Sequence, residues 1–182
     1  MRQCCKLNYK KMKQFIVKNC VKEIKQLLVN LISEAHLNKI IGNNKWTFFL
    51  KEKLAILGES YNFQVSVGGF KDDYNSEWLF DLVWFKEEVI GDNSRLIDIP
   101  LVVESEWGIK LQDIKYDFEK LLVSRAAIRL MICESSKINL ASRIEYFKDA
   151  VNMFKMSQKG DFYLIAILLT DTEEFHFEEI TF

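Results

Sequence analysis

The segment Ile99–Trp107 (Ile-Pro-Leu-Val-Val-Glu-Ser-Glu-Trp) places two carboxylates inside an otherwise apolar run. Its composition predicts a buried β-strand. Residues two apart on a strand point to the same face of a sheet, so Glu104 and Glu106 are expected side by side. Burying paired carboxylates is costly unless a proton or a cation neutralises them. This pair therefore constrains both the fold and the function.

A second apolar run, Glu77–Phe85, carries one more acid, Asp81, at its centre. If this run pairs with the strand expected over 97–107 as a hairpin, with the acidic faces together, three carboxylates converge. Hard divalent cations such as Mg²⁺ bind oxygen ligands of this kind, with waters and a substrate phosphate completing the shell. We therefore predict a Mg²⁺ or Mn²⁺ site formed by Asp81, Glu104 and Glu106.

The alternative interpretation is that these acids are solvent-facing residues of an amphipathic sheet. They would then form salt bridges with basic residues such as Arg129. This interpretation explains less well why three acids lie at strand centres flanked by apolar residues such as Trp78, Phe80, Trp84 and Val103.

Hydrophobic periodicity along the chain predicts ten elements in the order α-α-β-β-β-α-β-α-β-β. A mixed β-sheet with helices on both faces accounts for this order, so we expect an α/β (mixed α+β) fold. The chain fits one domain, with residues 1–45 as a basic helical extension and residues 46–182 as the main body. The expected helices cover 14–36, 47–59, 110–125 and 138–157, and the expected strands cover 63–67, 77–85, 97–107, 127–133, 162–169 and 174–182.

Charge is distributed unevenly. Residues 1–53 carry twelve Lys and Arg residues against three acids, whereas the other residues hold thirteen basic and twenty-three acidic ones. A basic segment suits a phosphate backbone or an acidic partner. Alternatively, it docks on the acidic body of its own chain. The apolar stripe over 17–35 could also bury a partner helix, which would give a homodimer.

Composition excludes several classes of protein. No apolar run approaches the roughly 20 residues that span a bilayer, and the start, Met1–Lys6, lacks the apolar stretch of a secretory signal. The four cysteines show neither metal-ligand spacing nor a disulfide framework. Neither a Walker loop nor a Gly-X-Ser-X-Gly elbow is present. We expect a cytoplasmic protein that makes no membrane contact.

The order helix, three strands, helix, strand, with an acid in the second strand and Glu-X-Glu on the third, resembles the PD-(D/E)XK nuclease superfamily. The resemblance covers roughly residues 47–169 and implies a restriction-endonuclease-like fold. It also implies that Asp81 and Glu104 are metal ligands. Residue 106 corresponds to the lysine of the usual motif, but here it is glutamate, a variant that some members of the superfamily carry.

Members that lack this lysine sometimes recruit a basic residue from the following helix, which makes Lys110 and Lys120 candidates. At about 100° per residue, Lys120 points about 150° from the centre of the apolar stripe and Lys110 about 70°. Helical-wheel geometry therefore favours Lys110. Superfamily sites often add a glutamate from the helix before the first strand, where Glu52 and Glu59 are available, although neither lies on the apolar stripe.

The resemblance implies a Mg²⁺- or Mn²⁺-dependent phosphodiesterase, an endonuclease acting on nucleic acid, with DNA as the expected substrate. Asp81 and Glu104 would bind the metal ion, Glu106 would add a ligand or orient the attacking water, and Lys120 is a candidate basic residue. The missing strand lysine prompts the alternative. The chain would then be a catalytically inactive nuclease-fold protein that serves as a nucleic-acid or protein binding module.

Overall fold

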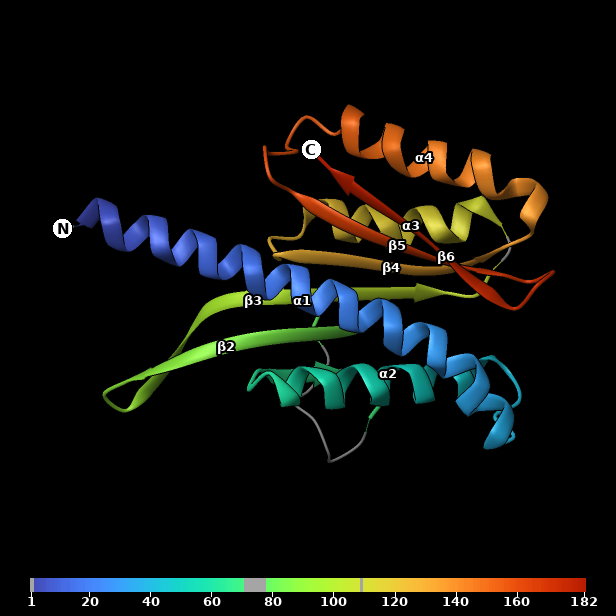
Figure 1. Ribbon diagram of the computed structural model, residues 1–182, viewed down its shortest axis with the longest axis horizontal. Coiled ribbons are helices and arrows are strands. Elements are labelled where there is room, and N and C mark those ends of the chain that lie inside the picture. Colours follow the sequence, from blue (N-terminus) through green and yellow to red (C-terminus); the bar gives the residue numbers. More distant parts are fainter. Residues whose placement is uncertain (1, 71–77, 109) are drawn as a thin grey trace.

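The structure, a computed structural model, describes residues 2–70, 78–108 and 110–182, with side chains described from residue 17 onward. Its centre is a six-stranded sheet in the order β1-β2-β3-β4-β5-β6 (Figure 1). β1, β2 and β3 form an antiparallel meander, β3, β4 and β5 are parallel, and β6 is antiparallel to β5. The strands are Gln64–Val67 (β1), Leu82–Ile90 (β2), Asn93–Glu106 (β3), Ile128–Ser135 (β4), Phe162–Leu169 (β5) and Glu174–Thr181 (β6).

Two helices pack on each face of the sheet. α1 (Arg2–Leu37) and α2 (Asn43–Ser60) cover one face, and α3 (Leu111–Val123) and α4 (Leu140–Met153) cover the other. A short 3₁₀ helix, Lys137–Asn139, precedes α4. This arrangement confirms the predicted mixed sheet flanked by helices. In the described part of the chain, no helix is both long and apolar enough to cross a membrane.

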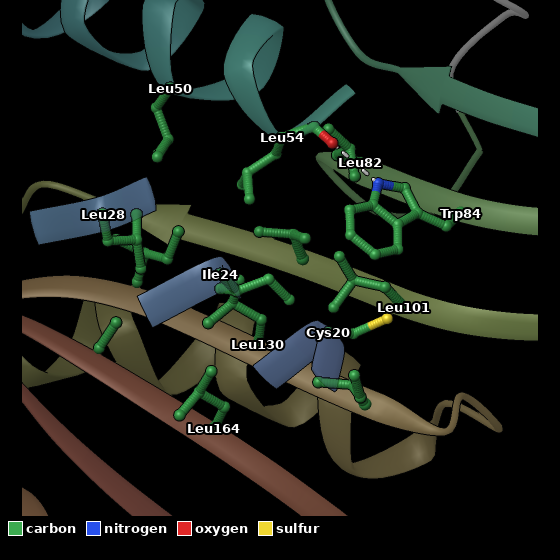
Figure 2. Close-up of a cluster of buried hydrophobic side chains, with 14 of the residues drawn as sticks. Cys20, Ile24, Leu28, Leu50, Leu54, Leu82, Trp84, Leu101, Leu130 and Leu164 are labelled. Atoms are coloured by element: carbon green, nitrogen blue, oxygen red, sulfur yellow. Dashed lines mark hydrogen bonds between the residues drawn. The ribbon is translucent and has the colours of Figure 1, made fainter. Parts of the chain in front are cut away.

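The apolar stripe of α1 packs on the sheet of its own chain. Because the stripe expected over 17–35 is buried there, it is not available to a partner helix. Lys25 Nζ lies 2.6 Å from Glu179 Oε1 on β6, so the basic helix also docks on the acidic body. Figure 2 labels buried side chains from α1, α2 and four strands: Cys20, Ile24, Leu28, Leu50, Leu54, Leu82, Trp84, Leu101, Leu130 and Leu164.

α2 approaches the sheet closely at Gly58. A Cβ atom at this position would lie 2.5 Å from Nε1 of Trp84. The indole cannot easily yield, because Trp84 is fully buried and its Nε1 donates a hydrogen bond to the Leu54 carbonyl (3.1 Å, Figure 2). Glycine therefore lets this helix pack directly on the indole.

Gly58→Ala should consequently lower the free energy of unfolding, by about 1–3 kcal/mol, the usual cost of overpacking. At an ordinary position in a helix interior, a change from glycine to alanine raises the free energy of unfolding by about 1 kcal/mol. Urea unfolding measures the difference. In a Trp84→Leu background most of the penalty should disappear. A gain of stability in the wild-type background would contradict the close approach.

β2 begins later than the sequence indicated. The strand expected over 77–85 starts at Leu82, and residues 71–77 lie outside the described residues. Asp81 therefore precedes the strand and does not lie at its centre, which corrects the prediction. The reason is local: the Asp81 carboxylate, and not a strand carbonyl, accepts the hydrogen bond from the Ser105 amide of β3.

The β2–β3 hairpin is longer than predicted. We expected a turn over Glu87–Ser94, but β2 continues to Ile90, β3 starts at Asn93, and the turn shrinks to two residues. Gly91 adopts φ +64° there, a conformation that glycine tolerates. The outer half of the hairpin pairs only with itself, so it buries little and leaves no hydrophobic pattern in the sequence.

Candidate functional site

The β2–β3 hairpin brings Asp81 and Glu104 together, as predicted. Leu82 pairs with Val103 in the antiparallel register. Asp81, which precedes Leu82, and Glu104, which follows Val103, are therefore neighbours across the two strands. The charge of Asp81 adds to the rise in the pKa of the Glu104 carboxyl, although burial is the larger cause. Two of the three predicted carboxylates therefore occupy neighbouring positions where β2 starts and β3 ends, Asp81 bonded to Lys51 of α2 and Glu104 to Lys120 of α3.

Glu104 is a buried carboxyl with one basic partner. Its side chain is 1% exposed, and its Oε2 lies 2.7 Å from Nζ of Lys120 on α3. The same ammonium lies 2.9 Å from Oδ1 of Asp117. The other oxygen of Glu104, Oε1, is buried and has no hydrogen-bond partner among the described residues. This carboxyl is therefore only half satisfied.

Burial dominates the electrostatics of this pair. It raises the pKa of the Glu104 carboxyl to about 8, although the hydrogen bond from Lys120 acts in the opposite direction, and the charges of Asp81 and Asp117 add to the rise. For Lys120, burial alone would lower the pKa, but the hydrogen bonds and charges of Glu104 and Asp117 outweigh it and raise the pKa. The site therefore retains positive charge on α3.

Asp81 is held from two sides. Its Oδ2 accepts hydrogen bonds from the backbone N (2.9 Å) and the Oγ (2.7 Å) of Ser105. Its Oδ1 lies 2.9 Å from Nζ of Lys51, which also donates a hydrogen bond to the Gly68 carbonyl (3.3 Å). Asp81 thus has a neutral partner on β3 and a charged partner on α2.

Glu106 bonds to the backbone at the start of α3. Its Oε1 accepts a hydrogen bond from the Gly108 amide at 2.5 Å. A Cβ atom at Gly108 would lie 2.8 Å from this oxygen and 3.0 Å from Oδ2 of Asp113, so Glu106 faces the first turn of α3. The convergence of the three carboxylates on one metal ion therefore stays a prediction, and Glu106 has a hydrogen-bond partner of its own.

Lys120, and not Lys110, reaches Glu104. Lys110 is exposed at the N-cap of α3, whereas the four-carbon stem of Lys120 bends from the outer side of the helix to Glu104. The wheel argument was wrong because it treats a long side chain as a rigid spoke. Glu52 is half-buried and Glu59 is exposed, and in the described structure neither is bonded to Asp81 or Glu104.

Sequence reasoning missed Lys51, Ser105 and Asp117. For Lys51 a signal was present, because this lysine borders the apolar stripe of α2 between Leu50 and Leu54. A lysine in a buried stripe requires a carboxylate or carbonyl partner. Ser105 and Asp117 gave no comparable signal, since their partners are set by the packing of β3 and α3.

Arg129 does not neutralise the strand acids. It is buried, its NH2 lies 3.1 Å from Asp161 Oδ1, and it donates a hydrogen bond to the Ser124 carbonyl. Together with the burial of Glu104, this rules out the interpretation in which Glu104 is a solvent-facing residue paired with Arg129.

The donor set suits a hard cation. Asp81 and Glu104 supply carboxylate oxygens, the ligands that Mg²⁺ and Mn²⁺ prefer, and the unpartnered Oε1 of Glu104 is available for a positive charge. Within the described ranges, no three His, Cys, Asp or Glu side chains are already grouped to hold a metal ion. Two lysines, Lys51 and Lys120, instead take the positive positions beside the acids.

Comparisons of this chain with known proteins found no relative. No family model, no curated protein and no solved structure matches the chain.

Proposed function

We propose that this protein is a Mg²⁺- or Mn²⁺-dependent phosphodiesterase that cleaves nucleic acid, with DNA as the expected substrate, on a core of the PD-(D/E)XK type. The observation that carries the proposal is the half-satisfied, buried carboxyl of Glu104 next to Asp81. A buried acid without a full set of partners is destabilising, and such groups concentrate at functional sites.

The topology supports the same proposal. α2, the antiparallel meander β1–β3, α3 and the parallel strand β4 follow one another as the resemblance implies. The two acids lie at the same end of the central hairpin. Lys120 comes from the helix after the third strand of the motif, the helix from which members of the superfamily without the strand lysine sometimes recruit a basic residue.

The proposed roles follow from the contacts. Asp81 and Glu104 would hold the ion, which when bound would polarise the phosphodiester and lower the pKa of a coordinated water. Ser105 fixes the Asp81 carboxylate from β3, and Lys120 orients Glu104 from α3. Glu106 adds a ligand or orients the attacking water only after giving up its hydrogen bond to Gly108.

A second candidate is a catalytically inactive protein of the same fold that binds nucleic acid or protein. It is favoured by the pairing of both acids with lysines, since such pairs can persist without any metal ion. The basic α1 helix would then be the binding surface, or the contact with a second copy, through residues that do not pack on the sheet.

Two measurements test the proposal. Purified protein is incubated with double- and single-stranded DNA and RNA in Mg²⁺ or Mn²⁺, with a chelator as control, and metal-dependent cleavage is the expected result. Isothermal calorimetry with Mn²⁺ separates the two candidates, because an active site should bind the ion and lose that affinity in Glu104→Gln. Absence of binding by the wild-type protein would favour the inactive module.

A further inference from the structure

Lys51 is the most deeply buried lysine of the described chain. It is 9% exposed, on the side of α2 that faces the sheet, between the fully buried Leu50 and Leu54. Its Nζ lies 2.9 Å from Asp81 Oδ1 and 3.3 Å from the Gly68 carbonyl oxygen. Lys53, two residues along the same helix, makes an outer ion pair with Glu34 instead.

Stability alone is a poor explanation for this lysine. Removing the Lys51 ammonium from water is costly even though the Asp81 side chain stays 24% exposed, and the attraction within such a pair often does no more than compensate for the lost hydration. A pair of apolar residues in the same place would usually stabilise the fold equally well. Because the partner of Lys51 is the acid that we propose as a metal ligand, a role in the site accounts for its burial better.

The two oxygens of Asp81 are used differently. Oδ2 is fixed by two neutral donors of Ser105, while the charge at Oδ1 is balanced by Lys51 alone. A divalent cation and an ammonium at the same carboxylate oxygen would repel each other strongly in this half-buried site. An ion that binds at Oδ1 would therefore compete with Lys51 for this oxygen.

Lys51 and Lys120 differ in what they can do once released. Lys120 has two carboxylate partners, Glu104 and Asp117, so it stays on α3 when one of them changes. Lys51 has one carboxylate partner and a carbonyl. A lysine ammonium is also a compact point charge that binds phosphate well.

Resting on the proposed function, we propose that Lys51 is the resident counterion of Asp81 and a catalytic residue of this site. Lys51 gives up Asp81 Oδ1 when a divalent cation binds there, and its ammonium then contacts a phosphate of the nucleic-acid substrate. Lys120 is a positioning residue that keeps Glu104 in place. In the free protein, the Lys51 ammonium thus balances the charge of Asp81 that the metal ion would otherwise balance.

The test compares Lys51→Met with Lys53→Met, a matched change on the same helix. Calorimetry with Mn²⁺ alone should give tighter binding in Lys51→Met, on the order of tenfold, because the competing ammonium is gone. Lys53→Met should bind as the wild type does. Unchanged or weaker Mn²⁺ affinity in a folded Lys51→Met protein would overturn the proposal.

The phosphate contact has its own readout. With Ca²⁺ at saturation, a fluorescent DNA duplex should bind Lys51→Met about tenfold more weakly than the wild type, the loss expected for about 1.4 kcal/mol of contact. Lys53→Met should change this affinity by no more than about twofold. Equal DNA affinity in wild type and Lys51→Met would contradict the contact.

A wild-type measurement covers the case in which Lys51→Met does not fold. Amine acylation followed by peptide mass spectrometry should show that Mn²⁺ increases the labelling of Lys51 and leaves that of Lys53 unchanged. If Mn²⁺ binds in a way that depends on Asp81 but Lys51 labelling is unchanged, only this inference fails. If Mn²⁺ does not bind at all, the proposed function fails with it.

Discussion

Replacing Asp81 with alanine is expected to reduce metal-dependent cleavage by at least a factor of about 100. A bound divalent cation is worth several kcal/mol of transition-state stabilisation, and each 1.4 kcal/mol is a factor of ten in rate. Asp81 also forms part of the scaffold, since Ser105 and Lys51 both bond to it. Single-turnover cleavage in Mn²⁺ measures the loss.

The control for this change is Asp92→Ala. Asp92 is exposed in the turn of the β2–β3 hairpin, so the same chemical change there should leave cleavage within about twofold of wild type. Because Asp81→Ala leaves Lys51 buried without its carboxylate, thermal unfolding must establish that the variant is folded under the assay conditions. Full cleavage by folded Asp81→Ala would contradict the role assigned to this residue.

The order of elements was predictable because nearly every helix and strand buries one face. Burial leaves a period of 3.6 or 2 in the sequence, as in α3, where Ile114, Phe118 and Leu121 are fully buried. The outer part of the β2–β3 hairpin could not be predicted in this way. It is held by pairing between two exposed strands, and pairing without burial leaves no periodic pattern.

The acids of the site were predictable for a related reason. Glu104 directly follows the apolar run Ile99–Val103, so its burial could be inferred without a structure. The partners of the acids could not be inferred in the same way. Whether Lys110 or Lys120 reaches Glu104 depends on side-chain torsions, and whether Lys51 meets Asp81 depends on how α2 crosses the sheet.

The buried carboxyl of Glu104 should lower the free energy of unfolding of the protein, and Glu104→Gln tests this directly. Burial raises the pKa of the Glu104 carboxyl from about 4.5 to about 8, so the folded chain binds this proton more tightly than the unfolded chain does. Between these two pH values, folding takes up a proton. The free energy of unfolding of the wild type therefore falls as the pH rises, by up to about 1.4 kcal/mol per pH unit.

Glutamine has nearly the same shape as glutamate and stays neutral at every pH, so Glu104→Gln should escape this loss. The variant should match the wild type near pH 4.5 and exceed its free energy of unfolding by about 2 kcal/mol or more at pH 8, although it is expected to lose metal affinity. Urea unfolding across this pH range, in buffer with a chelator, measures the difference in free energy of unfolding between the variant and the wild type.

The exposed Glu119 of α3 provides the control, because Glu119→Gln should change the free energy of unfolding by less than about 0.5 kcal/mol. A pH-independent gap between Glu104→Gln and wild type would mean that the buried carboxyl is not destabilised in the folded protein, and the main support for a functional site would be lost.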